Sequence, residues 1–307
     1  MTDNASFSVI FAGDYNMEHS GTHHNEHWTE VIEPKSSLFD LQIKEVWRYK
    51  DLLMLLVRRD FVATYKQTIL GPIWFFLQPL LTTLTFVFVF NNIAGISTGT
   101  VPATLFYMAG TTLWNYFADC LNKTSTVFRD NASVFGKVYF PRLIMPLSIV
   151  ISNLIKLGIQ FILFMAFWGY YLINSTAVEP NMTVLLLPVL VVIMGGLGLG
   201  FGMIISAMTT KYRDLVFLLT FAVQLLMYAT PIIYPINSPN IKPEVKSILM
   251  LNPMSPVVET FRYAFLGSGG GMFSWGGLAY AGIFTVVVVA FGTVIFNKVE
   301  KSFMDTV

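Results

Sequence analysis

Charged side chains are scarce in this sequence. They make up 12% of its 307 residues, whereas 54% of the residues are hydrophobic, and a soluble domain carries about 25% charged residues. This deficit excludes an ordinary water-facing surface, and the mean hydropathy of +0.62 is typical of a protein embedded in a bilayer. The net charge of +1 provides no basic field that would attract nucleic acid.

Motifs for nucleotide, metal and proton chemistry are also missing. No G-x-x-x-x-G-K-[ST] loop is present to hold ATP phosphates, so we expect no cofactor on this chain. All four histidines lie in the polar first 37 residues, where His23 and His27 are four apart and a metal site is disfavoured. The apolar stretches lack a carboxylate relay, which argues against proton coupling. Active transport would therefore take its energy from another chain. The single cysteine, Cys120, excludes an internal disulfide and is interpreted as an inert buried thiol.

Long apolar stretches dominate the rest of the chain. A hydrocarbon core of about 30 Å needs roughly 20 helical residues, and six stretches qualify. They are residues 73–93, 103–121, 143–173, 183–208, 215–233 and 278–296. The third is too long for one perpendicular crossing, so we expect it to tilt or to project from the core. The sequence predicts an all-α membrane protein with six transmembrane helices.

Basic residues orient these predicted spans. With the N-terminus in the cytoplasm, 15 of the 19 Lys and Arg residues fall on the cytoplasmic side and three on the external side. Because positive charge concentrates in cytoplasmic loops, we expect both termini to be cytoplasmic. The remaining basic residue, Lys156, lies inside the third span. It either faces a water-filled or anionic substrate path, or it pairs or snorkels within the bundle.

Three domains follow from this pattern. Residues 1–37 are predicted to be a disordered cytoplasmic tail without the apolar core of a signal peptide, so the spans themselves should direct insertion. Residues 38–70 are predicted to form an amphipathic interface helix, with Trp47 at headgroup level and Arg58 and Arg59 among its basic residues. The alternative is a plain extension of the first span. Residues 71–307 form the six-span domain.

An external segment, residues 234–277, is rich in proline and predicts two short re-entrant helices. One would run from Pro243 to Leu251, and the second would be capped by Ser255 and stopped by Gly267. Neither is long enough to cross the bilayer. They either shape a pore, with Phe261 and Arg262 as candidate path residues, or form an external cap without a transport role.

Small and aromatic residues leave two further alternatives. Gly198, Gly202 and Ser206 share one face of the fourth span, which predicts close helix packing against a partner in this chain or in a second copy. Aromatic residues near the span ends form either an interfacial belt or a sugar-stacking surface. The candidates for stacking are Trp74, Phe75, Trp114 and Tyr116.

The cytoplasmic loop, residues 123–142, is short and basic. Asn131 is expected to cap a helix of about two turns that starts at residue 132 and ends before Pro141. Apolar residues exposed on such a helix would invite a protein partner; the alternative is a tight connection between spans. The candidate contact residues in this loop are Arg129, Asn131, Phe135, Lys137 and Tyr139.

Four tracts resemble the transmembrane subunits of type-2 ABC exporters, especially those for O-antigen polysaccharide and teichoic acid. They are RRDFVATYKQTILGPIWFFLQP at residues 58–79, VFGKVYFPRLIMP at residues 134–146, KYRD at residues 211–214, and ATPIIYP followed by LNPMSPVVETFRYAFLG at residues 229–267. Their order and spacing around six spans carry the resemblance, which covers the chain from about residue 40 to the C-terminus.

This resemblance implies a mechanism. Two copies of the chain would form the path through the bacterial inner membrane, and two copies of a separate ATPase, which binds ATP and Mg²⁺, would dock from the cytoplasm. The loop helix would couple the two, with the interface helix and Lys211, Arg213 and Asp214 as further contacts. The cargo would be a lipid-linked glycan, and the chain itself would not be an enzyme.

Three alternative functions compete with this interpretation. An exporter of drugs or lipids would share the fold. A membrane-embedded enzyme acting on lipid-linked sugars would need inward-facing Asp, Glu or His clusters, which the spans hardly offer. A secondary transporter is disfavoured because no inverted repeat and no acidic relay are visible.

Overall fold

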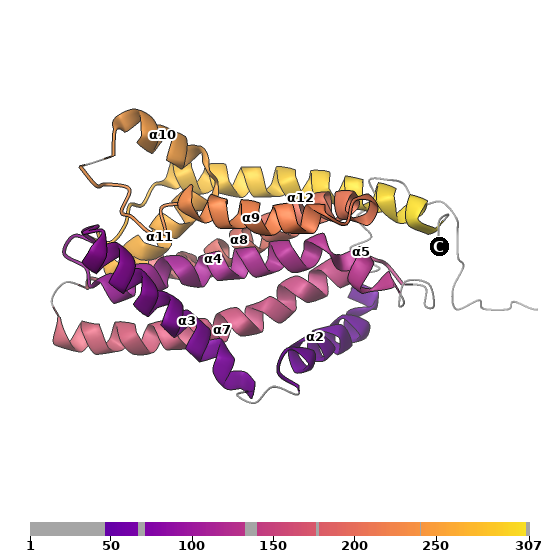
Figure 1. The fold of residues 1–307 in the computed structure, drawn as a ribbon, viewed down its shortest axis with the longest axis horizontal. Coiled ribbons are helices and arrows are strands. Elements are labelled where there is room, and N and C mark those ends of the chain that lie inside the picture. Colours follow the sequence, from indigo (N-terminus) through magenta and orange to yellow (C-terminus); the bar gives the residue numbers. More distant parts are fainter. Residues whose placement is uncertain (1–46, 67–70, 133–139, 176–177, 240, 305–307) are drawn as a thin grey trace, which may run out of the picture. The chain divides into compact units, whose positions relative to one another are not determined.

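The computed structural model describes residues 47–66, 71–132, 140–175, 178–239 and 241–304, and within these ranges all regular structure is helical (Figure 1). The tail, its histidines, and Phe135, Lys137 and Tyr139 of the loop lie outside the described residues. Predictions made for them are therefore not tested by the structure. The described longer helices are α2 (Lys50–Tyr65), α3 (Trp74–Phe86), α4 (Ala103–Ser125), α7 (Ile144–Asn174), α8 (Leu187–Lys211), α9 (Leu215–Tyr228), α11 (Met254–Leu266) and α12 (Trp275–Met304).

Shorter helical segments join or extend these. A turn of 3-10 helix, η1 (Gly71–Ile73), leads into α3, and a π-helical stretch, η2 (Val87–Ile93), continues it. The remaining described segments are α5 (Val127–Asp130), η3 (Met182–Leu186) and α10 (Pro243–Leu251). Each of the six predicted apolar stretches overlaps at least one of the described helices.

Four of the described helices are long and apolar enough to cross a membrane. They are Trp74–Ile93, Ile144–Asn174, Met182–Lys211 and Trp275–Val299. The third predicted span is the single 31-residue helix α7, with Pro146 in its first turn, where a missing N–H costs no hydrogen bond. The chain is therefore an all-α membrane protein.

The other two predicted spans, α4 and α9, fall short of this standard for different reasons. Helix α4 has 23 residues but is less apolar, and residues 105–114 are all buried by neighbouring helices. A helix surrounded by protein does not need an apolar surface. Helix α9 was expected to extend to residue 233 but ends at Tyr228. Pro231 follows closely, and the residue before a proline disfavours helical dihedrals.

The glycines of α8 pack within this chain, which answers the question that the sequence left open. A Cβ on Gly198 would lie 2.6 Å from Cys120 Cβ of α4, and one on Gly202 would lie 2.5 Å from Thr124 Cβ. On the other face, a Cβ on Gly200 would lie 3.0 Å from the backbone of α12 at Val288. Small residues thus let α8 approach both α4 and α12 closely.

Helix α2 is separate from α3 and is not a straight extension of the first span. It ends at Tyr65, and Gly71, with φ of 52°, begins the turn into α3. Leu56 and Val57 are buried, and Ser152 of α7 donates a 3.5 Å hydrogen bond to the Val57 carbonyl. Trp47 is 76% exposed. One side of α2 therefore packs on α7, whereas Met54 and Leu55 of α2 are exposed.

Helices α10 and α11 occur where two short helices were predicted, but they differ in burial. Helix α10 has no buried residue, whereas almost all of α11 is buried. The predicted cap of α11 was wrong. Ser255 lies inside the helix and donates to the Leu249 carbonyl, while Asn252 Oδ1 accepts the Met254 N–H. Gly267, with φ of 79°, ends α11 as expected.

Candidate functional site

Arg262 of α11 connects three segments at the end of the molecule where α10 and α11 lie. Its guanidinium donates to the carbonyls of Phe106 (3.2 Å), Ile232 (2.6 Å) and Pro231, and its Cζ lies 3.6 Å from the centre of the Phe106 ring. The side chain is fully buried. A Cβ on Gly110 would come within 2.6 Å of Arg262 Nη2, so that glycine leaves room for it. In this conformation Arg262 has no surface left for a cargo.

Glu259 is the acidic partner of Arg262, one helical turn away. Its Oε1 lies 3.4 Å from Arg262 Nη1, and its Oε2 accepts the Met272 N–H at 3.1 Å. Burial raises the pKa of Glu259, and the positive charge of Arg262 opposes that rise. Since backbone carbonyls accept most of the hydrogen bonds that the guanidinium donates, the main role of Glu259 is to join α11 to the segment before α12.

The C-terminal end of α11 is anchored by two other side chains. Trp168 of α7 donates from Nε1 to the Phe265 carbonyl at 2.8 Å, and Asn181 donates from Nδ2 to the Tyr263 carbonyl at 2.8 Å. The last carbonyls of a helix lack partners within the helix, so these donors come from neighbouring elements. Together with Arg262 they fix α11 among α4, α7 and the segment before α8.

A polar seam joins α4 to α7. Lys156 Nζ lies 2.6 Å from Asp119 Oδ2, and both side chains are partly buried. One turn away, Lys123 Nζ donates to Asn153 Oδ1 at 3.2 Å. The structure thus favours the interpretation that Lys156 pairs within the bundle. Asp119 of α4 is therefore paired with a cation of the same chain.

The candidate contacts for an ATPase lie at the C-terminal end of α4, away from Arg262. Arg59 of α2 donates to Asn131 Oδ1 at 3.2 Å, which links α2 to the loop that follows α5. Asn131 closes α5, and its Nδ2 donates to the Val127 carbonyl. Arg58, Arg59 and Arg129 are exposed. Two segments that the sequence singled out separately therefore meet at this basic end.

The KYRD turn between α8 and α9 belongs to the same end. Thr209 near the end of α8 donates to the Ser125 carbonyl at the end of α4. Lys211, Arg213 and Asp214 follow directly and are exposed. The basic end thus consists of α2, α5 and the α8–α9 turn, and it presents charged side chains of both signs to a partner.

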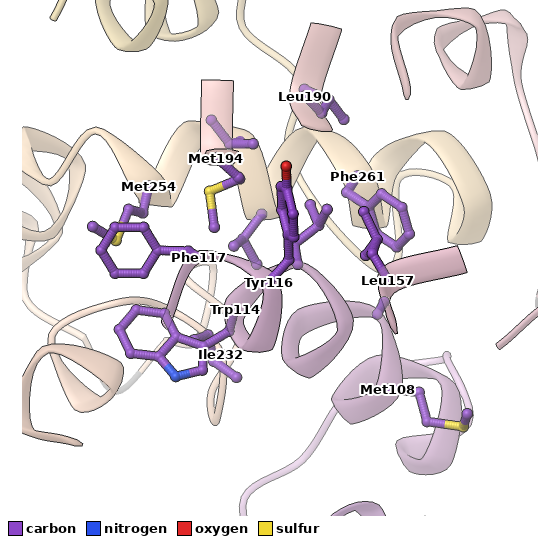
Figure 2. Packing of buried hydrophobic residues seen from close by; sticks show 14 of the residues in the cluster. Met108, Trp114, Tyr116, Phe117, Leu157, Leu190, Met194, Ile232, Met254 and Phe261 are labelled. Carbon is purple, nitrogen blue, oxygen red and sulfur yellow. The ribbon is translucent and has the colours of Figure 1, made fainter. Parts of the chain in front are cut away.

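Most aromatic candidates for a substrate path are buried in the core. Figure 2 shows Trp114, Tyr116 and Phe261 among apolar side chains such as Phe117 and Met194. Tyr116 covers Gly195 of α8, where a Cβ would lie 2.5 Å from its hydroxyl oxygen.

The remaining two aromatic candidates lie at the start of the first span. Phe75 is buried and stacks on Phe61 of α2, with ring centroids 6.1 Å apart. Trp74 is 47% exposed. Of the aromatic candidates, only Trp74 offers a ring to a ligand in this conformation.

Comparison with known proteins gives a consistent result. Residues 51–266, more than two thirds of the chain, match the ABC-2 type transporter family. The chain belongs to this family. It is 28% identical over 227 residues to the O-antigen export system permease protein RfbA of Myxococcus xanthus. The matched stretch covers 73% of this chain and 83% of that protein. It is 26% identical over 261 residues to a protein of the same name from Klebsiella pneumoniae, which covers 83% of this chain and 94% of that protein.

Membership of the ABC-2 family confirms the resemblance that the four sequence tracts indicated. The family is one of transport proteins, and it implies an ABC ATPase as a partner. The match includes α2, the basic end, the polar seam and α11. The features described above are therefore features of the transport domain.

Sequence reasoning missed two partners in this ABC-2 domain. Glu259 could have been found from its spacing of three residues before Arg262 on an expected helix. Asp119 could have been suspected as the one carboxylate near Lys156, but choosing it required the relative rotation of α4 and α7. The carbonyls that hold Arg262 had no signal in the sequence, because every residue has a carbonyl.

Proposed function

We propose that the chain is the transmembrane subunit of an ATP-driven ABC exporter that moves a lipid-linked polysaccharide across the bacterial inner membrane. The observation that carries this is the family match over residues 51–266, together with relatives that are named O-antigen export permeases. The polysaccharide would be O-antigen-like or teichoic-acid-like. The chain is expected to bind no nucleotide, so that ATP and Mg²⁺ belong to the partner ATPase.

Six crossings are proposed, with α4 and α9 completing the four apolar spans. Helix α4 is about 34 Å long at 1.5 Å per residue, which matches the hydrocarbon core, and its neighbours shield it. Helix α9 is shorter, and the buried residues Thr230, Ile232 and Ile233 continue its path. Both termini and the basic end then lie in the cytoplasm, and α10 and α11 lie toward the outside with α11 re-entrant among the spans.

A homodimer is proposed to form the path, with α3 and α9 at its centre. In the most apolar stretch of the span Trp74–Ile93, 17% of the residues are buried within the chain, which is the lowest share among the four apolar spans. In α9 only Leu219 and Val223 are buried. These two helices leave most of their apolar surface to lipid or to a second copy, and a second copy is what the proposed path requires.

The ATPase is proposed to contact the basic end. Reversing exposed charge there, in Arg129→Glu and Arg59→Glu, should weaken co-purification of the chain with its ATPase and lower export of the glycan, because docking would bring like charges together. Lys242→Glu at the α10 end is the matched control. Lys242 is also exposed, and its replacement should leave both unchanged because it lies away from the basic end. Normal co-purification and export in the Arg129→Glu and Arg59→Glu variants would remove the basic end from this role.

A further inference from the structure

A pocket of about 630 Å³ opens beside α10, at the end of the molecule that is proposed to be external. One wall is the loop of residues 94–99 that follows η2, and the other consists of residues 234–239 and Ile241, which precede α10. Val245 and Leu249 of α10 and Gly269 complete it. Its volume lies within the range of about 300–1,000 Å³ that is typical of ligand sites.

The described residues that line this pocket carry no charge. The side-chain polar groups come from Ser97, Thr98, Ser238, Asn237 and Tyr234, and the rest are glycine, alanine, proline and aliphatic residues. An anionic ligand would need a cation or several oriented donors. A lipid tail would offer no partner to the NH₂ group of Asn237 or to the Ser238 hydroxyl. A sugar offers both hydroxyl groups and C–H faces, and it matches this mixture.

The segment of residues 234–239 is held in place from several directions. Arg262 donates to the carbonyl of Ile232, just before it. Tyr234 donates from its hydroxyl to the Tyr228 carbonyl at 2.9 Å, and Lys246 of α10 donates to Asn237 Oδ1 at 2.8 Å. That bond fixes the Asn237 amide and leaves its NH₂ group as a donor for a ligand. A wall fixed before binding costs less ordering entropy on binding.

The opposite wall is also held by hydrogen bonds. Thr98 donates to the Val101 carbonyl at 2.9 Å, and Ser97 Oγ accepts the Gly99 N–H at 3.2 Å. Gly99 and Gly95 have φ of 73° and 65°, a region that favours glycine. A Cβ on Gly99 would lie 3.6 Å from the Gly269 carbonyl, so this loop approaches the segment after α11.

We propose that this pocket binds sugar residues of the exported glycan as they leave the path on the external side. The inference rests on the proposed function and goes beyond it by assigning a site on the chain, with uncharged sugar rings as the ligand. It also gives Arg262 a role at the site as a residue that positions one wall without contacting the glycan.

Cysteine labelling tests this directly, because Cys120 is fully buried and is the only cysteine of the chain. Ser97→Cys and Ser238→Cys place a thiol on opposite walls of the pocket, and Asn174→Cys, at the exposed end of α7, is the control. The chain is purified in complex with its ATPase and labelled with a maleimide. The ligand is the oligosaccharide released by mild acid from the glycan whose surface display depends on this chain.

We expect the oligosaccharide to slow labelling of both pocket variants about threefold at about twice its Kd, since labelling follows the unoccupied fraction, and to leave the Asn174→Cys variant unchanged. Equal rates with and without oligosaccharide, or equal slowing in the control, would overturn the proposal. If one pocket variant does not fold, the other decides. The proposed function fails separately, if deletion of the chain leaves every surface glycan displayed normally.

Discussion

The contact between α8 and α12 permits a prediction whose sign can be worked out from the structure. A Cβ on Gly292 of α12 would lie 2.6 Å from the backbone oxygen of Gly200 and 3.3 Å from its Cα. Both atoms belong to the main chain of a long helix, so neither can move without shifting that helix. Gly282, on the same helix ten residues earlier, would meet nothing within 4 Å. Gly292→Ala and Gly282→Ala are therefore a matched pair.

The magnitudes separate the two variants. Adding a methyl group to a well-packed contact costs about 1–3 kcal/mol, and a clash with backbone atoms places Gly292→Ala toward the upper part of that range. Alanine forms helices more readily than glycine by about 1 kcal/mol, which offsets part of the cost. At Gly282 only this gain remains. The free energy of unfolding should fall in Gly292→Ala and stay equal or rise in Gly282→Ala.

Thermal unfolding of the purified chain in one detergent, followed by size exclusion and tryptophan fluorescence, measures both variants against the wild type. We expect the order Gly282→Ala, wild type, Gly292→Ala from the highest to the lowest midpoint. A Gly292→Ala variant that melts at or above the wild-type temperature would refute the close approach of α8 and α12, and with it the explanation given for the glycines of α8.

Three further perturbations test other parts of the account. Arg262→Leu should lower the free energy of unfolding by about 3–5 kcal/mol, because it leaves a buried carboxylate and three carbonyls without a partner. In thermal unfolding, the midpoint of Arg262→Lys should lie between those of Arg262→Leu and the wild type. Wild-type stability in Arg262→Leu would contradict the hydrogen bonds assigned to Arg262. Lys156→Met should lower both stability and export. Adding Asp119→Asn should restore part of the stability by removing the unpaired charge. A double variant that is no more stable than Lys156→Met would argue against the pairing of Lys156 with Asp119. Phe221→Cys on α9 should form a disulfide between two copies under mild oxidation. Val287→Cys on α12 is about equally exposed and should not form one. The reverse pattern on a gel would move the proposed dimer interface away from α9.

The sequence predicted the helices well where composition alone determines them. Continuous apolar runs in a chain with few charges have to form membrane helices, because a backbone in hydrocarbon must satisfy its own hydrogen bonds. Helix α7 accordingly runs over Ile144–Asn174, within a residue of the expected span. The exact ends depended on local chemistry that competes with hydropathy. Pro231 follows the shortened α9, and Asn252 rather than Ser255 accepts the first N–H of α11.

The candidate sites were less predictable because they depend on how helices are rotated against each other. A stripe of Gly198, Gly202 and Ser206 predicts close helix packing but does not identify the helix that packs against it. In the structure that helix is α4. The pairing of Lys156 with Asp119 needed the faces of α4 and α7 to be known. Arg262 was expected near a path from its place in a short external helix, and its partners turned out to be carbonyls of other segments.

The most direct test of the central claim is export by purified components. The chain and its ATPase are reconstituted in liposomes with the lipid-linked glycan in the leaflet on the ATPase side, and the glycan that becomes protected from an added glycosidase is measured with and without ATP. We predict protection that needs ATP, this chain and the ATPase together. Protection of the glycan without the chain, or no protection while the complex hydrolyses ATP, would contradict its assignment as the transmembrane subunit of a polysaccharide exporter.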